Sequence, residues 1–169
     1  WERQGVLPDG QSPWRECNLN TNYTLCATYP SLLIVPAKIT DHTVQEASSY
    51  RTKGRLPMLS WCHPQHGATL WRSSQPMAGI GQNHSHSDEV LLRAIVQPNV
   101  IRPKLTVVDC RPRLNAEANR FKGGGVESAR LHKGGSSFIE SVAFMDIANI
   151  HAVRKSYRKL RGLVESHST

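Results

Sequence analysis

Residues 104–110 are the part of the chain that most limits how it can fold. Their sequence, Lys-Leu-Thr-Val-Val-Asp-Cys, is rich in β-branched residues and lies between Pro103 and Pro112, which predicts a buried strand. A polar turn follows, and residues 114–121 can form a helix that ends at the three glycines 123–125. The sequence therefore predicts a strand, a turn and a helix, with polar side chains at the carboxyl end of the strand, where α/β sheets place their ligand sites.

The other segments alternate between strand-like and helix-like patterns. The expected strands lie at residues 31–36, 55–61, 68–73 and 137–145. The second and third of these flank a turn of the form His-Pro…His-Gly, so we expect an antiparallel hairpin. Ser87 is a natural N-cap for a helix of about ten residues that ends near Pro98. Because strands interleave with helices, the predicted fold class is α/β.

The positive charge of the chain is unevenly distributed. The net charge is +8, of which residues 111–133 contribute +4, residues 151–163 contribute +5 and the remainder −1. The second basic segment lies in a long amphipathic helix whose apolar face is formed by Ile147, Ile150, Val153, Tyr157, Leu160 and Val164. Such clusters suit an anionic partner (nucleic acid, an anionic membrane or a phosphorylated small molecule), although a solvated helix face has the same pattern.

Length and composition indicate one globular domain. With 169 residues the chain can bury a core, and no apolar run approaches the ~20 residues that a membrane span needs. Charged residues make up only 20% of the chain and aromatic residues recur along it, which argues against wholesale disorder. Residues 1–24 are polar and contain Pro8, Gly10 and Pro13, so we expect an irregular lead-in or linker before a domain at residues 25–169.

Cysteine and histidine usage favours reduced thiols and no metal site. Sequons for glycosylation begin at Asn22 and Asn83 and would suit a secreted protein, but four cysteines in 169 residues are far from a disulfide-dense scaffold. The best candidate metal ligands are Cys62, His63, His66, His84 and His86. Because neither cluster has the repeated ligand spacing of a zinc site, we expect no metal.

The sequence contains no recognisable catalytic motif. Neither a G-x-S-x-G elbow nor a phosphate-binding loop is present. A cysteine phosphatase needs an arginine six residues after its cysteine, so that one loop holds the nucleophile and the phosphate clamp. The residues at that distance from Cys17, Cys26, Cys62 and Cys110 are Tyr23, Leu32, Ala68 and Ala116. Cys110 closes the predicted buried strand and is expected to be an inert core thiol.

The polar turn at residues 109–115 has two interpretations. Arginine forks and asparagine amides at this edge of a sheet can hold a phosphate or a polyol. Alternatively, the segment is a charged turn in which Asp109 pairs with a neighbouring arginine, and Asn119 and Asn149 are ordinary turn or capping residues.

Residues 109–127 resemble a family motif. They read D-C-R-P-R-L-N-A-E-A-N-R-F-K-G-G-G-V-E and are similar to the stretch D-x-R-P-x-x-N-A-x-A-N-x-x-K-G-G-G-x-E of the myotubularin family of phosphoinositide 3-phosphatases. Further blocks in family order, among them R-S-S-Q-P and D-E-x-L-L, lie at residues 14–36, 50–61, 72–76, 88–92 and 147–160. The resemblance therefore extends over nearly the whole chain.

The resemblance implies a cysteine-phosphatase-like α/β domain of the protein tyrosine phosphatase superfamily, incomplete here because only its N-terminal half is present. In the family, two asparagines and the isoleucine after the second help to seat the inositol headgroup, and these fall on Asn119, Asn149 and Ile150. The nucleophilic cysteine, the phosphate-clamping arginine and the acidic proton donor belong to a downstream loop before which this chain stops. We therefore expect no catalytic residue in this chain and no activity from it alone.

The resemblance also implies the activity and surroundings of the complete protein. We expect hydrolysis of phosphatidylinositol 3-phosphate and phosphatidylinositol 3,5-bisphosphate through a phosphocysteine intermediate, without a metal or other cofactor. The expected partners are phosphoinositide headgroups at membrane surfaces and other myotubularins in a homo- or hetero-oligomer, but not nucleic acid. The expected location is cytoplasmic and peripheral to endosomal membranes.

Two alternatives to a phosphatase remain at this point. One is a pseudophosphatase or adaptor that binds active family members or phosphoinositides without catalysis, and the other is a basic nucleic-acid-binding module. The expected fold also has a consequence for stability. Because half of a sheet leaves an open edge and an uncovered apolar face, we expect this chain to aggregate or to be partly disordered.

Overall fold

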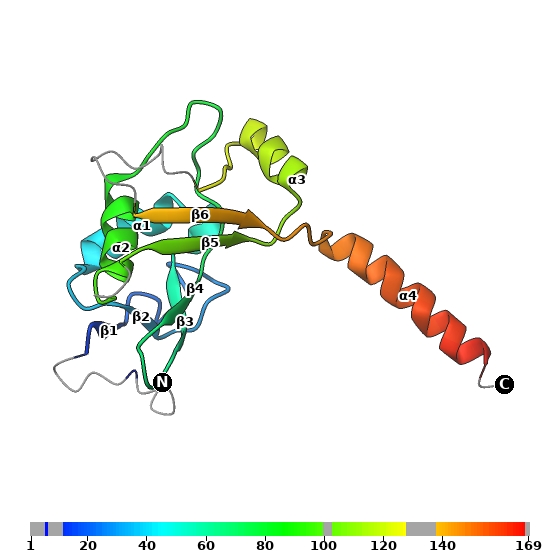
Figure 1. Cartoon of the computed structure of the whole chain (residues 1–169), viewed down its shortest axis with the longest axis horizontal. Coiled ribbons are helices and arrows are strands. Elements are labelled where there is room, and N and C mark those ends of the chain that lie inside the picture. The colour runs from blue at the N-terminus through cyan, green and yellow to red at the C-terminus, as the bar shows by residue number, and fades with distance from the viewer. Residues whose placement is uncertain (1–5, 7–11, 100–102, 128–137, 168–169) are drawn as a thin grey trace.

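The computed structural model describes residue 6 and residues 12–99, 103–127 and 138–167. These residues form a mixed α/β fold built on three two-stranded sheets (Figure 1). The strands are β1 (Trp14–Cys17), β2 (Leu33–Pro36), β3 (Met58–Cys62), β4 (Thr69–Arg72), β5 (Leu105–Asp109) and β6 (Ile139–Phe144). The helices are α1 (Asp41–Ser49), α2 (His86–Val96), α3 (Arg113–Ala118) and α4 (Ile150–Ser166), with short 3-10 helices η2 (Thr52–Gly54) and η3 (Asn119–Lys122).

Two antiparallel pairs form the N-terminal part of the fold. β1 pairs with β2, and β3 pairs with β4 across the His-Pro…His-Gly turn, so the predicted strand at 31–36 and the predicted hairpin are confirmed. The two pairs meet where the indole rings of Trp14 and Trp71 pack edge to face, with centroids 5.1 Å apart. The prediction of an irregular lead-in at residues 1–24 was wrong at β1, because backbone pairing with β2 outweighs the polar surroundings of this strand. Residues 1–5 and 7–11 of the predicted lead-in lie outside the described residues. The proposed domain boundary stays a prediction.

β5 and β6 form a parallel pair, with Leu105 opposite Ile139 and Asp109 opposite Phe144. Both predicted strands are therefore confirmed. The predicted burial of β5 was wrong, because its residues alternate between half-buried and exposed and β6 is the strand that pairs with it in the described part of the chain. Cys110, which follows β5, is exposed and is not the core thiol that we expected.

α1 and α2 pack beside the sheets and share the main apolar core with them. This core includes Leu33 and Val35 of β2, Val44 of α1, and Leu91 and Ile95 of α2. The core therefore joins segments far apart in the sequence, and it covers one side of the β5–β6 pair through contacts with Leu105 and Val107.

The predicted helix before Pro98 is confirmed as α2, but its cap differs from the prediction. Ser85 is the N-cap, and its Oγ accepts a hydrogen bond from the amide of Asp88 at 3.3 Å. Ser87 instead donates to the carboxylate of Glu46 on α1 at 2.5 Å. The serine predicted as a cap therefore links the two helices.

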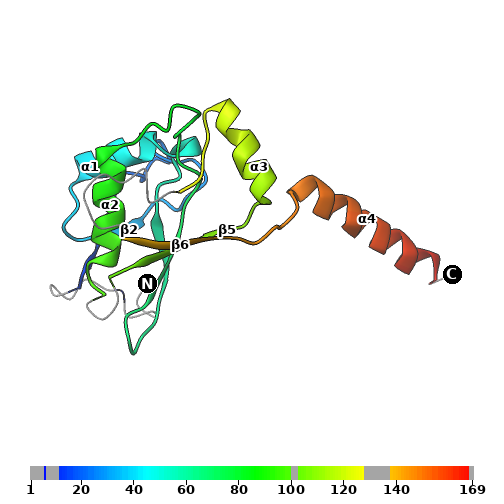
Figure 2. The same ribbon diagram turned by 45° about the horizontal axis from the view of Figure 1, so that its top comes forward.

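The two C-terminal helices follow the predicted patterns. The helix predicted at residues 114–121 is present as α3 and η3, and it ends at Gly123, whose φ of 82° favours glycine. α4 is confirmed and is N-capped by Asn149. In Figure 1 and in the turned view of Figure 2, α4 projects away from the rest of the molecule. None of the described helices is both long enough and apolar enough to cross a bilayer.

Tyr29 joins the loop before β2 to the hairpin and determines a response to alkaline pH. Its side chain is 6% exposed, its hydroxyl donates to the carbonyl of Arg72 at 3.2 Å, and burial raises the pKa of Tyr29 to about 12. An unfolded tyrosine ionises near pH 10, so above that pH the unfolded chain loses its proton before the folded chain does. The folded state then loses up to about 1.4 kcal/mol of stability per pH unit until the folded pKa is reached.

We therefore expect the free energy of unfolding to fall between about pH 10 and about pH 12, measured by urea unfolding and circular dichroism. Tyr29→Phe is expected to flatten this decline, whereas Tyr23→Phe, at a tyrosine that is 53% exposed, serves as the control. Burial also raises the pKa of Tyr50 to about 12, so a shallower decline persists in Tyr29→Phe. Identical slopes in the wild type and Tyr29→Phe would contradict the prediction.

Candidate functional site

A cavity of about 450 Å³ lies alongside β5. Every residue from Leu105 to Arg111 lines it, so the cavity follows the strand into the turn at its carboxyl end. Apolar lining comes from Pro57, Trp71, Leu92 and Ile95. Polar lining comes from Ser73, Ser74, Gln75, Asp109, Arg111, Asn119 and Glu127. The carboxyl end of β5, where the sequence predicted a ligand site, therefore borders a cavity with polar side chains.

Arg111 connects three segments at this end of the cavity. Its Nε and Nη2 donate to the carboxylate of Asp109 at 2.9 and 2.6 Å, and its Nη1 donates to Oε1 of Gln75. Nη2 also donates to the carbonyl of Gly125 at 3.0 Å. Burial alone raises the pKa of Asp109, but the hydrogen bonds and charge of Arg111 outweigh burial and lower that pKa below its ordinary value. The interpretation of a charged turn with Asp109 paired to an arginine is confirmed.

Arg51 is the centre of a second and more deeply buried group of ion pairs. Its side chain is 1% exposed, and its Nε and Nη2 donate to the carboxylate of Asp88 at 2.7 and 2.5 Å. Its Nη1 donates to the carboxylate of Glu127 and to Oγ of Ser73, the latter at 3.2 Å. Burial by itself lowers the pKa of Arg51, but Glu127 and Asp88 outweigh burial and raise it above its ordinary value. The guanidinium is therefore charged at all relevant pH values.

The five charged residues Arg51, Asp88, Asp109, Arg111 and Glu127 make up what we refer to as the arginine frame. Arg111 binds the carbonyl of Gly125, and Arg51 binds the side chain of Glu127 two residues later. The frame therefore anchors the start and the end of residues 109–127, which is the segment that carries the family motif.

Asn119 is held between these two anchors. It lies at the junction of α3 and η3 and lines the cavity, and its carbonyl accepts from the amide of Gly124 at 3.0 Å. The side-chain amide of Asn119 makes no hydrogen bond to any residue that the structure describes. This amide can therefore bind a polar ligand in the cavity.

Gly124 allows the motif to pass close to Gln75. A Cβ at this position would lie 2.5 Å from Nε2 of Gln75, whose Oε1 accepts from Arg111. A side chain here would displace the amide of Gln75 and break its contact with the arginine frame. The glycine triplet thus ends η3 and permits the close approach on which the frame depends.

Asn149 and Ile150 lie outside the cavity lining, at the start of α4. The chain that leads to them runs along the turn after β5, where the amide of Met145 donates to the carbonyl of Asp109 at 2.9 Å. The side-chain oxygen of Asn149 accepts from two amides of the first turn of α4 at 3.0 and 3.2 Å, as an N-cap does. The structure therefore brings Asn119 to the cavity but not Asn149 or Ile150, and the headgroup role of all three stays a prediction.

Cys17 and Cys62 lack the properties of a catalytic nucleophile. Burial raises the pKa of both thiols, which favours the protonated form over the reactive thiolate. All four cysteines are free. His63 and His66 stack with ring centroids 3.4 Å apart, and in the described part of the chain no three His, Cys, Asp or Glu side chains are placed to hold a metal ion.

Comparison with known proteins assigns the chain to a class. The family model described as "Myotubularin-like phosphatase domain" matches residues 1–169. The chain is 43% identical over 164 residues to phosphatidylinositol-3,5-bisphosphate 3-phosphatase MTMR2 of Mus musculus. The matched residues make up 97% of this chain and 24% of the relative. It is 44% identical over 162 residues to phosphatidylinositol-3-phosphatase myotubularin-2 of Arabidopsis thaliana (92% of this chain, 19% of the relative).

A third relative, myotubularin of Rattus norvegicus, is 40% identical over 167 residues, which are 99% of this chain and 26% of the relative. The chain therefore belongs to the myotubularin-like phosphatase family. The resemblance found in the sequence is confirmed. The chain spans about a quarter of the length of the curated relatives that it matches.

Sequence reasoning assigned no role to Arg51, Gln75 or Glu127, which support the site. All three lie in blocks of sequence that resemble the family, and this position is the indication of their importance that the sequence offered. The pairing itself had no local signal, because Arg51 and Glu127 are 76 positions apart.

Proposed function

We propose that the complete protein is a phosphoinositide 3-phosphatase that hydrolyses phosphatidylinositol 3-phosphate and phosphatidylinositol 3,5-bisphosphate, and that this chain supplies part of the headgroup-binding wall. The names of the relatives support the substrate class, since two of them are named as phosphatidylinositol phosphatases. In the same proposal the chain forms part of a phosphatase domain of the protein tyrosine phosphatase superfamily.

The observation that carries the proposal is the position of Asn119. Asn119 lines a cavity at the carboxyl end of β5, and its side-chain amide makes no hydrogen bond to any residue that the structure describes. The arginine frame anchors the loop that carries Asn119 on both sides. An asparagine amide donates to phosphate or hydroxyl oxygens and accepts from hydroxyl groups, and an inositol phosphate offers both. Because Arg111 is already bonded to Asp109, Gln75 and Gly125, the neutral amide is the better candidate to contact the ligand.

In this proposal, residues outside this chain carry out the phosphocysteine step. None of the four cysteines has an arginine six residues later, so the chain offers no loop that holds a thiolate and a phosphate clamp together. The role of the chain is then to bind and orient the headgroup. The complete protein is proposed to act in the cytoplasm at endosomal membranes, where it meets its lipids and other members of the family.

Asn119→Ala tests the binding role directly. We expect this chain to bind inositol 1,3-bisphosphate weakly in isothermal titration calorimetry, and Asn119→Ala to weaken binding about ten-fold to hundred-fold, because a hydrogen bond to a charged group contributes about 1.5–3 kcal/mol. Asn115→Ala is the matched control, since Asn115 is an exposed asparagine on α3 outside the cavity lining. No binding by the wild type, or equal affinities of the two variants, would contradict the proposal. Phosphate release from soluble phosphatidylinositol 3-phosphate by the complete protein tests the activity itself and separates a phosphatase from an adaptor.

A further inference from the structure

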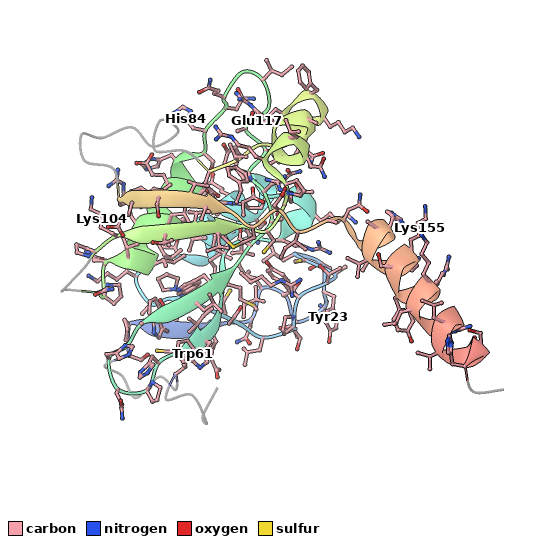
Figure 3. All side chains as sticks on the ribbon, turned by 45° about the vertical axis from the view of Figure 1, so that its right-hand side comes forward. Tyr23, Trp61, His84, Lys104, Glu117 and Lys155 are labelled. Atoms are coloured by element: carbon pink, nitrogen blue, oxygen red, sulfur yellow. The ribbon has the colours of Figure 1, made fainter. Side chains whose placement is uncertain are left out.

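The loop before α2 lies against the glycine triplet that follows η3. Figure 3 shows this loop, labelled at His84, and α3, labelled at Glu117, at the same end of the molecule, as does Figure 1. The amide of Gly79 in this loop donates to the carbonyl of Gly124 at 2.9 Å. A Cβ on Gly79 would lie 3.8 Å from the Cα of Gly123. The backbones of the two segments are therefore in direct contact.

Gln75 begins the segment that makes this contact, and the body of the fold holds its backbone. The carbonyl of Gln75 accepts from the amide of Thr52 at 3.2 Å. The next residue, Pro76, is buried and forms a β-bridge with Arg51. Arg51 is itself paired with Asp88 in the interior. The backbone at Gln75 therefore has a fixed position from which its side chain extends.

The side chain of Gln75 reaches the loop that carries Asn119 at two points. Its Oε1 accepts from Nη1 of Arg111, and its amide lies beside Gly124, where an added Cβ would be 2.5 Å from Nε2. Arg111 in turn donates to the carbonyl of Gly125 at 3.0 Å. Each of these contacts joins two residues that the structure describes, so none of them depends on parts of the complete protein outside this chain. Gln75 therefore supports both glycines.

The supported glycines determine where Asn119 lies. The carbonyl of Asn119 accepts from the amide of Gly124 at 3.0 Å, and its backbone amide donates to the carbonyl of Asn115 on α3. The backbone of Asn119 is thus bonded to α3 on one side and to the glycine triplet on the other. A shift of Gly124 therefore moves the Asn119 side chain relative to the cavity that it lines.

We propose that Gln75 is a positioning residue for the headgroup site. By holding Arg111 and Gly124 at once, it fixes the place of the Asn119 side chain in the cavity, and through Asn119 the affinity for an inositol phosphate. A hydrogen bond weakens as its geometry departs from the optimum, and a misplacement of about 1 Å can cost a factor of about one hundred. The inference rests on the proposed function, in which Asn119 contacts the headgroup.

A double-mutant cycle in the complete protein tests the inference. Gln75→Met keeps a side chain of similar length beside Gly124 but cannot accept from Arg111. We expect it to lower kcat/KM for a soluble short-chain phosphatidylinositol 3-phosphate about five-fold, which is less than the loss with Asn119→Ala. When Asn119→Ala is already present, Gln75→Met is expected to change kcat/KM less than about two-fold, because the side chain that it positions is gone.

Gly124→Ala tests the same contact from the other side. Its methyl group would displace the amide of Gln75, and the φ of Gly124 lies outside the left-handed region, so alanine adds no backbone strain. We expect a loss of kcat/KM similar to that of Gln75→Met, which again nearly disappears when Asn119→Ala is present. A loss that persists in full beside Asn119→Ala contradicts the inference.

Gln97→Met is the matched control. Oε1 of Gln97 also accepts from a cation, Nζ of Lys38 at 3.3 Å, but Gln97 lies outside the cavity lining. This variant is expected to leave kcat/KM unchanged. A loss equal to that of Gln75→Met would show that any glutamine with a cationic partner has this effect, and would overturn the inference.

The cycle separates positioning from a general structural role. A structural role lowers kcat/KM by the same factor with and without Asn119, so equal factors overturn the inference. An unchanged kcat/KM in Gln75→Met overturns it as well. So does a loss greater than that of Asn119→Ala, because Gln75 is then itself a contact of the ligand.

Failure of the proposed function is distinguishable from failure of this inference. An unchanged kcat/KM in Asn119→Ala contradicts the headgroup role of Asn119, and the inference falls with it. A loss in Asn119→Ala that Gln75→Met multiplies contradicts only the inference. If the complete protein releases no phosphate, the phosphatase activity is contradicted, and the same cycle is measured on the affinity for inositol 1,3-bisphosphate by isothermal titration calorimetry.

Discussion

Replacing Arg51 by leucine is expected to lower the free energy of unfolding by about 3–5 kcal/mol, because removing one partner of a buried ion pair leaves charges buried without compensation. The side chains of Asp88 and Glu127 are only 2% and 12% exposed, and both accept hydrogen bonds from Arg51. The lost energy is a large part of the total stability of about 5–15 kcal/mol of a typical domain. Urea unfolding followed by circular dichroism measures the change.

Arg15→Leu provides the matched control for Arg51→Leu. Arg15 also pairs with an aspartate, Asp41, at 2.6 Å, but the two side chains are 27% and 56% exposed. A surface pair of this kind contributes about 0–1 kcal/mol. Arg51→Lys keeps the charge but not the two-pronged contact with Asp88, so it is expected to fall between the two leucine variants. If Arg51→Leu costs no more than Arg15→Leu, the arginine frame does not stabilise the fold.

Secondary structure could be predicted from the sequence where apolar residues recur at a regular spacing or where prolines bound a segment. β5 lies between two prolines, and the hairpin of β3 and β4 surrounds a recognisable turn. α1 has no comparable signal, because only Val44, Ala47 and Ser48 of its nine residues are buried. It forms because Thr40 caps it and because it packs against α2. Tertiary contacts of this kind outweigh local preference and are invisible in a single sequence.

The candidate site was predictable only in its local part. Asp109 and Arg111 are two positions apart, and their pairing was one of two interpretations of the turn. The contacts of Arg51 with Asp88 and Glu127 join positions 37 and 76 residues away, and no spacing rule predicts them. The family resemblance singled out Asn119, but only the structure shows that this residue lines the cavity and that its amide makes no hydrogen bond to a described residue. The sequence also could not show that Arg111 is an internal support, because its partners Gln75 and Gly125 are 36 and 14 positions away.

Gly54→Ala is expected to lower the free energy of unfolding by about 2–5 kcal/mol, which combines the cost of a left-handed backbone with that of overpacking. Gly54 has a φ of +68°, and a Cβ there would lie 2.4 Å from the carbonyl oxygen of Leu25. The oxygen cannot easily move, because buried Asn20 holds the adjoining Cys26 through its amide at 2.8 Å and its carbonyl at 3.0 Å. The melting temperature is then expected to fall by about 5–15 °C, measured by thermal unfolding.

Gly67→Ala separates the two contributions to this loss. Gly67 has nearly the same backbone conformation, with a φ of +66°, but a Cβ there meets nothing within 4 Å. The substitution therefore measures the cost of the left-handed backbone alone, and we expect it to lower the free energy of unfolding by about 1–2 kcal/mol. The difference between the two variants measures the close contact with Leu25. Equal losses at Gly54 and Gly67 would mean that the loop held by Asn20 yields to the added methyl group and is not the rigid support that its hydrogen bonds imply.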